Sequence, residues 1–250
     1  MNPLDDEFLA SCPVEGGFRM RGLEMTRLEV FVDAAFAFAV TMLVISFDAI
    51  PTNFDELLDA IKGIPGFAIA AVQLVWIWYT HSRWSRRYGL DDAWTVVLSA
   101  ALLIVVLVYV YPLRILMGGM FAWFTNDYLP SGFVLRNWEE LSGLFVFLGI
   151  GWVVLCTVYV LMYRYAARLC EPLRLNEVEL RETHTLAWQW SGAGAIGVLA
   201  LVVVLLVPAE WSPFTGFTYT LLGIWFPGIR WWRARQAVGQ RPLTRTGSAL

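Results

Sequence analysis

The sequence predicts an all-α membrane protein with six transmembrane helices, and three observations support this fold class. Hydrophobic residues make up 58% of the 250 residues, and the mean hydropathy is +0.59. Charged residues make up only 16% of the chain, well below the roughly 25% of a soluble domain. Apolar runs recur at lengths near the ~20 helical residues that cross a bilayer. The net charge of −3 predicts no nucleic-acid partner, since such proteins carry basic surfaces.

The six predicted spans follow one another along the whole chain. The first, residues 28–47, contains the acidic residue Asp33, and the second, residues 64–79, begins beside Pro65. The third to fifth are long and apolar. The sixth is short and interrupted by glycines, and we expect it to use flanking tryptophans at the membrane interface. These last four spans cover residues 93–111, 141–163, 186–207 and 214–226.

Two segments outside the spans also have helical patterns. In residues 52–62, the side chains of Phe54, Leu57, Leu58 and Ile61 recur at the spacing of one helical face. We expect this short amphipathic helix to lie along the outer membrane interface. Charged residues around Glu179, between the fourth and fifth spans, predict a solvated helical extension on the cytosolic side.

The charges of the connecting segments predict the orientation of the chain. If both termini are cytosolic, the inner segments hold 15 of the 18 Lys and Arg residues, and the outer segments hold only Lys62, Arg114 and Arg136. Cytosolic loops carry such an excess of basic residues in membrane proteins. We therefore predict a cytosolic segment at residues 1–26, a six-span membrane domain at 27–232 and a cytosolic polar tail at 233–250.

The first span has a distinct apolar stripe. At 100° per residue, Phe38, Thr41, Met42 and Ile45 fall within an arc of about 100°, while Asp33 lies about 140° from Phe38. Asp33 and the stripe must therefore face different surroundings. From the residues alone, the stripe is more typical of ordinary helix packing than of a pore lining.

A second group of polar residues shares one membrane depth with Asp33. The start of the first span, with Arg27 and Asp33, and the end of the second, with Trp78 and His81, both lie on the predicted cytosolic side. A buried carboxylate in hydrocarbon needs partners. We therefore predict a structural network of these four side chains. The alternative is a proton sensor, because an Asp–His pair can titrate between about pH 5 and 7.

These residues resemble the signature of the transmembrane protein 175 family of potassium channels. The family opens with an Arg, then Phe-Ser-Asp four residues on, then a Thr eight residues after the Asp, and Arg27, Asp33 and Thr41 have these spacings. The family's Trp-x-x-His pattern is matched by Trp78 and His81, and the proline that ends its third span by Pro112. Val32 departs from the pattern, since the family has a serine at this position.

The resemblance implies a homotetrameric potassium channel in the bacterial plasma membrane. The first helix of each subunit would line a central pore in the lipid bilayer, with Phe38, Met42 and Ile45 as its apolar constriction and Thr41 beside them. No cofactor or bound metal is implied, only permeant K⁺. The family usually has Ile or Leu where this chain has Phe38, so a tighter constriction is expected.

Three alternatives to a channel remain open. Phe38 leaves room for a non-conducting signalling or scaffold protein of the same fold. A proton-coupled transporter is disfavoured, because hydropathy shows no inverted repeat. An intramembrane enzyme is also disfavoured, because the sequence has no HExxH or GxSxG motif and Asp33 is the only carboxylate deep inside a predicted span.

Overall fold

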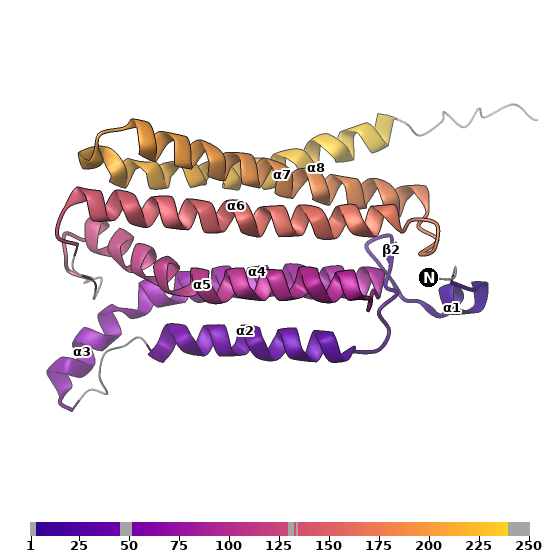
Figure 1. Cartoon of the computed structure of the whole chain (residues 1–250), viewed down its shortest axis with the longest axis horizontal. Coiled ribbons are helices and arrows are strands. Elements are labelled where there is room, and N and C mark those ends of the chain that lie inside the picture. The colour runs from indigo at the N-terminus through magenta and orange to yellow at the C-terminus, as the bar shows by residue number, and fades with distance from the viewer. Residues whose placement is uncertain (1–3, 46–51, 130–132, 134, 240–250) are drawn as a thin grey trace, which may run out of the picture.

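The computed structural model describes residues 4–45, 52–129, 133 and 135–239, and most of them are helical. Figure 1 shows long helices that run along a common axis and pack into an elongated bundle. The prediction of an all-α protein is confirmed. The long helices are α2 (Arg27–Ile45), α4 (Ile64–Tyr88), α5 (Ala93–Phe124), α6 (Trp138–Arg168), α7 (Glu177–Leu206) and α8 (Leu221–Gly239).

Short elements precede and connect these helices. The N-terminal segment forms helix α1 (Asp6–Ser11) and a small antiparallel hairpin of β1 (Val14–Glu15) and β2 (Phe18–Arg19), in which Glu15 pairs with Phe18. The short helix α3 (Phe54–Lys62) precedes α4, and a 3₁₀ helix, η1 (Ala209–Thr220), joins α7 to α8.

Polar caps fix where the helices begin. The side chains of Asn53, Asp92, Asn137 and Asn176 each accept a hydrogen bond from a backbone amide in the first turn of α3, α5, α6 and α7. Such caps satisfy amides that have no partner inside the helix. Helix α4 ends at Gly89, whose φ of 59° lies in the left-handed region that favours glycine.

Helix α3 has the amphipathic character predicted for residues 52–62. Its axis is bent by 44° from that of α4, and Figure 1 shows it pointing away from the bundle. All four apolar residues of its predicted face, Phe54, Leu57, Leu58 and Ile61, are exposed in the subunit. The prediction of a helix here is confirmed, and its apolar face has no partner within the described part of the subunit.

Helix α5 continues beyond Pro112, so the prediction that the third span ends at this proline is wrong. Pro112 lies inside a helix of 32 residues, and Arg114, predicted to lie in an outer loop, is also inside it. Long membrane helices tolerate proline because neighbouring groups satisfy the freed carbonyl. Close packing supports this half of α5, since a Cβ built on Gly66 of α4 would lie 3.0 Å from the Cα of Gly118.

The sixth predicted span has different bounds in the structure. Residues 214–220 belong to η1, and α8 runs from Leu221 to Gly239, past the boundary predicted at 232. Trp231 and Trp232 therefore lie within the helix and do not flank it. The apolar pattern did not separate the two elements, because η1 is at least as apolar as the helix that follows it.

Length and composition identify fewer spans than the six predicted. The helices α5, α6 and α7 are each long and apolar enough to cross a membrane, and the bent pair of α3 and α4 is a fourth candidate among the described residues.

The core lies where α4, α5, α6 and α7 meet. Tyr159 of α6 stacks on Trp190 of α7 with ring centroids 4.2 Å apart, and its hydroxyl donates a 2.6 Å hydrogen bond to the carbonyl of Ile77 in α4. Trp84 and Tyr88 continue this aromatic core toward the end of α4. The core thus holds α4 in a fixed position, and α2 packs on α4 and α5.

The bundle has a basic end and an acidic end. Figure 1 shows the N-terminal segment, the end of α4, the α6–α7 connection and the end of α8 gathered at one end, on the right. We call this the basic end, because these segments, the start of α2 and the second half of α8 carry 13 of the described arginines: Arg19, Arg21, Arg27, Arg83, Arg86, Arg87, Arg164, Arg168, Arg174, Arg181, Arg230, Arg233 and Arg235. The opposite end, with α3 and η1, is the acidic end.

Candidate functional site

Helix α2 has one buried face. Val32, Phe36, Ala39 and Leu43 recur every three or four residues and are each at most 3% exposed. They pack against α4 and α5. This spacing is that of an amphipathic helix whose core-facing stripe is fixed by its neighbours, so the rotation of α2 about its axis is set within the subunit.

The opposite face of α2 is exposed in the subunit. Phe38 is 55% exposed and Phe31 63% exposed. The hydroxyl of Thr41 donates a 2.9 Å hydrogen bond to the carbonyl of Ala37, so it is satisfied within the helix. An exposed apolar face on a membrane helix must meet lipid, another subunit or a dewetted pore. Besides Thr41, the exposed face is formed by Val30, Phe31, Ala34, Ala37, Phe38 and Val44.

The three predicted constriction residues do not share one environment in the subunit. Phe38 is on the exposed face. Met42 is half-buried at its border, where the hydroxyl of Tyr111 donates to its Sδ at 3.4 Å. Ile45 ends α2, and its side chain lies outside the part of the chain that the structure describes.

Asp33 lies beside the buried face and has an indole partner. The Nε1–H of Trp78 in α4 donates a 2.7 Å hydrogen bond to Oδ1 of Asp33. His81, one helical turn further along α4, is 2% exposed, and its Nε2 lies 3.0 Å from the Oγ of Ser99 in α5. Both contacts tie α4 to a neighbouring helix at the same depth.

The predicted group of four polar residues is only partly brought together. Asp33 and His81 have separate partners, and no direct hydrogen bond joins them. Arg27 is exposed and has no ion pair within the described residues. Ser99, which the prediction left out, completes the contact of His81. Ser99 is a polar residue in the apolar run of the third predicted span, and this could have indicated its contact with His81.

The basic end contains a buried ion pair that was not predicted from the sequence. Arg21 donates from Nη2 to Oε2 of Glu179 at 2.8 Å, and the two side chains are 1% and 0% exposed. Glu179 was predicted to be solvated, and this was wrong because the N-terminal hairpin covers it. The backbone amide of Arg19 in β2 also donates to Glu179, at 2.8 Å.

The hydrogen-bond partners of Glu179 lower its pKa more than burial raises it. Burial alone would raise the pKa of this carboxyl, but the hydrogen bonds from Arg21 and from the amide of Arg19 lower the pKa below its ordinary value. Glu179 lies at the basic end of α7, before the predicted span at 186–207. It is therefore ionised at neutral pH and attaches the N-terminal segment to α7.

Neighbouring contacts extend this attachment to α4. The guanidinium of Arg87 lies 4.7 Å from the ring centroid of Phe18, and its Nη2 donates a 2.7 Å hydrogen bond to Glu182 of α7. The amide of Gly22 donates to the carbonyl of Arg86 at 2.9 Å. The segment that leads into α2 is thus fixed to the ends of α4 and α7.

The chain is similar to known proteins. The model of the endosomal/lysosomal potassium channel TMEM175 family matches residues 27–110. A protein of Marivirga tractuosa described as a potassium channel is 35% identical over 216 residues, which cover 82% of this chain and 85% of that protein. The chain belongs to the TMEM175 family.

A solved structure extends the likeness to the fold. The crystal structure of a variant of the potassium channel MtTMEM175, in complex with a nanobody–MBP fusion protein, superposes with a TM-score of 0.76 at 30% identity. The superposition covers 90% of this chain and 98% of the MtTMEM175 chain. The TMEM175 match spans α2, α4 and the first half of α5, so it contains Asp33, Trp78 and His81 as well as Phe38. With three apolar helices of spanning length, this is a membrane protein.

Proposed function

We propose that this TMEM175 protein is a potassium channel that assembles as a homotetramer in the bacterial plasma membrane. The observation that carries the proposal is the exposed apolar face of α2, which lies within the residues that match the family model. Four copies of α2 would surround a central pore. The relatives supply the ion, since both are described as potassium channels.

The proposed topology has six spans, with the basic end in the cytosol. Besides α3–α4, α5, α6 and α7, we propose that α2 and α8 cross the membrane, because both run parallel to these helices (Figure 1). The gathering of arginines at one end supports the orientation, because basic residues concentrate on the cytosolic side. Both termini would then be cytosolic.

The constriction would act through hydration. Rings of apolar side chains leave no oxygen to replace the water around an ion, so narrow hydrophobic segments control passage by dewetting. Phe38 is the most exposed large side chain at the centre of α2, and we propose that four Phe38 rings form the narrowest level. Met42 and Ile45 would form further levels, with Thr41 beside them.

The polar contacts would hold the pore helix without facing the pore. The Asp33–Trp78 hydrogen bond lies on the α4 side of α2, and the buried stripe fixes the same side. We propose that these contacts, with His81 and Ser99, keep Phe38 directed away from the subunit core. Arg27 would find a partner only in the assembled channel or at the headgroups.

The test is potassium flux from liposomes that contain the purified wild type, Phe38→Ala or Phe217→Ala. Phe217 is also an exposed phenylalanine, but it lies on η1. We expect flux in the wild type, a several-fold increase in Phe38→Ala and no change in Phe217→Ala. Background flux in the wild type and in Phe38→Ala would overturn the channel proposal.

A second candidate is a non-conducting protein of the same fold, and the bulk of Phe38 favours it. Four phenyl rings at one level could close the pore to hydrated ions. The same liposomes separate the two candidates, because a closed wild type would show background flux while Phe38→Ala conducts.

A further inference from the structure

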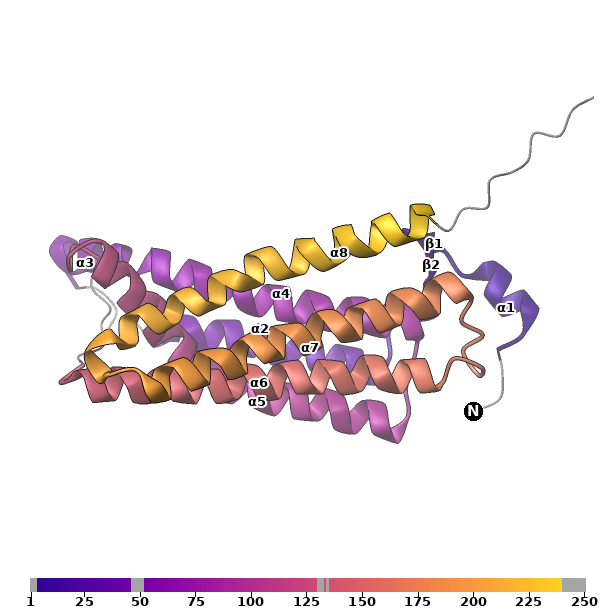
Figure 2. The ribbon, with the colours of Figure 1, turned by 90° about the horizontal axis from the view of Figure 1, so that it is seen from above.

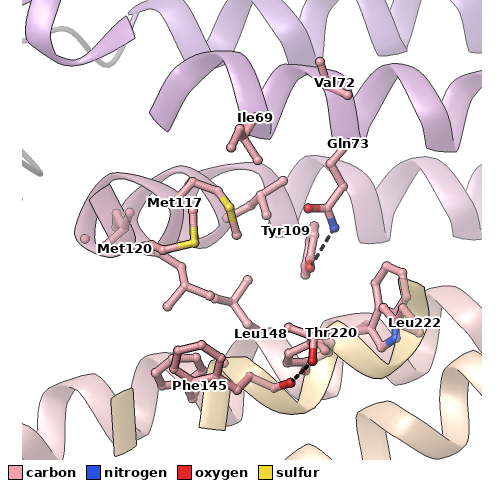
Figure 3. A pocket seen from close by; sticks show the side chains of 18 of the residues that line it. Ile69, Val72, Gln73, Tyr109, Met117, Met120, Phe145, Leu148, Thr220 and Leu222 are labelled. Atoms are coloured by element: carbon pink, nitrogen blue, oxygen red, sulfur yellow. Dashed lines mark hydrogen bonds between the residues drawn. The ribbon is translucent and has the colours of Figure 1, made fainter. Parts of the chain in front are cut away.

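A long cavity lies beside the core, between the two halves of the bundle. It has a volume of about 2000 Å³, roughly twice the largest volume usual for drug-sized ligands. Its walls come from α4 and α5 on one side and from α6, α7, η1 and α8 on the other. Figure 2 shows α8 diverging from α7 toward the basic end. Figure 3 shows Ile69, Met117, Met120 and Leu148 directed into the common space.

The middle of the cavity offers little to a polar ligand. Two polar residues that line it, Gln73 and Tyr109, bond to each other: Nε2 of Gln73 donates a hydrogen bond to the hydroxyl of Tyr109 at 3.4 Å (Figure 3). Methionine, leucine and aromatic side chains form the surrounding walls. Flexible methionines adapt to irregular apolar partners, so the cavity suits a hydrocarbon chain.

The basic end of the same cavity carries three arginines: Arg83 and Arg87 of α4 and Arg230 of α8. Within the described part of the chain, one carboxylate forms an ion pair with these arginines, and it is that of Glu182, paired with Arg87. Arg83 donates to the hydroxyl of Tyr79 and lies over its ring, and neither Arg83 nor Arg230 forms an ion pair among the described residues. Arg87 is 7% exposed, and its buried Nε has no hydrogen-bond partner in the described part of the chain. The cavity mouth therefore holds an excess of positive charge.

The spacing of these features matches one leaflet of a bilayer. Ten residues of α4 separate Arg83 from Gln73, which is about 15 Å along a helix. Half of a hydrocarbon core of ~30 Å has the same depth. A ligand with an anionic head at the arginines and an apolar body reaching the bundle centre would fill this half of the cavity.

We propose that this cavity binds one anionic phospholipid per subunit. The phosphate contacts Arg83 and Arg230 at the basic end, and an acyl chain lies between α4, α5 and α8. The site requires the chain to lie in a membrane, but it does not require potassium conduction. It therefore goes beyond the proposed function.

Native mass spectrometry of the delipidated full-length protein in detergent tests the site. The probes are phosphatidylglycerol and phosphatidylcholine with identical acyl chains. Because each arginine near a membrane surface favours anionic lipid, and the site has two without a carboxylate partner, we expect phosphatidylglycerol to bind about tenfold more tightly. Equal binding of the two lipids would overturn the proposal.

Matched variants separate the headgroup site from general surface charge. Arg83→Gln with Arg230→Gln should abolish the preference for phosphatidylglycerol. The control, Arg164→Gln with Arg168→Gln, removes the same charge from exposed arginines of α6 that do not line the cavity. An equal loss in the control would overturn the site. If the first pair impairs folding in size-exclusion chromatography, Arg230→Gln alone carries the test, because this side chain is exposed.

Two glycines of α8 provide a matched pair of variants that tests the path of the acyl chain. Gly223 lines the cavity, Gly228 does not, and a Cβ at either glycine would meet open space. We expect Gly223→Phe to weaken binding of both lipids several-fold and Gly228→Phe to leave it unchanged. Unchanged binding in both variants would overturn the proposal. So would full competition by glycerol 3-phosphate, because the site would then hold a phosphate without a chain.

Discussion

At the scale of single residues, the hydrogen bond from Trp78 to Asp33 explains how α2 keeps a carboxylate between apolar residues. We predict that Asp33→Ala lowers the free energy of unfolding by about 1–3 kcal/mol, because the indole N–H of Trp78 is left without its acceptor. Thermal unfolding of the detergent-solubilised protein measures this. Trp78→Phe should be destabilising as well, and the double variant should cost less than the sum of the two. Strictly additive costs would show that the two side chains do not depend on each other.

The buried pair of Arg21 and Glu179 gives a prediction with a defined pH dependence. Glu179→Gln should destabilise the protein at pH 7 by about 3–5 kcal/mol, because it leaves Arg21 buried without a counter-charge. The folded pKa of Glu179 is lowered, so its contribution is fully present above the unfolded value of about 4.3. It is lost as the pH falls through the folded pKa.

The measurement is the difference in melting temperature between wild type and Glu179→Gln from pH 7 to pH 3. This difference should shrink only below about pH 4.3. The exposed residue Glu177, in the same helical turn, supplies the control variant Glu177→Gln, which should unfold like the wild type. A constant difference across the range would contradict the assignment.

The two residue sites differ in how far the sequence predicts them. Asp33 and Trp78 sit in apolar runs, where a polar side chain stands out, and the helical period places them at one depth. Arg21 and Glu179 each lie in polar segments 158 residues apart, and a charged residue there is ordinarily solvated. Only the packing of the hairpin on α7, which no local pattern encodes, makes the pair buried.

At the scale of elements, the end of α4 depends on a glycine. Gly89 has a φ of 59°, and a Cβ built there would lie 2.9 Å from the carbonyl carbon of Arg21. We predict that Gly89→Ala costs about 1–2 kcal/mol from backbone strain alone, and more from the clash with the segment that leads into α2. Gly228→Ala, where the added methyl meets open space, should not be destabilising. Equal melting temperatures for the two variants would contradict this role of Gly89.

The elements also show where the apolar pattern fails as a guide. It identified α2, α4, α6 and α7 by long apolar runs and α3 by the helical spacing of its apolar residues. It ended the third span at Pro112, since proline breaks helices in water, whereas a membrane interior favours continued backbone hydrogen bonding. It also placed a span over η1, because 3₁₀ and α segments of similar composition have no distinguishing pattern.

At the scale of the whole molecule, composition and charge predicted a helical membrane bundle, and the distant segments that carry most of the arginines do gather at one end (Figure 1). The cavity could not be predicted in this way. Its walls come from six elements between Ile69 and Arg230, and its apolar lining is indistinguishable in sequence from residues that face lipid. What surrounds an exposed helix face is likewise a property of the assembly, not of the chain.

The exposed face of α2 gives a prediction about that assembly. Ala34 lies on this face, beside Phe38 and away from the buried stripe. If four α2 helices meet at a central axis, a tryptophan at this small, exposed position should prevent their close approach. We expect Ala34→Trp to elute as a smaller species than the wild type in size-exclusion chromatography with light scattering. Ile224→Trp, on exposed α8 in the other half of the bundle, should assemble like the wild type. If Ala34→Trp forms the same oligomer as the wild type, α2 does not line a tightly packed central axis, and its apolar face must instead contact lipid.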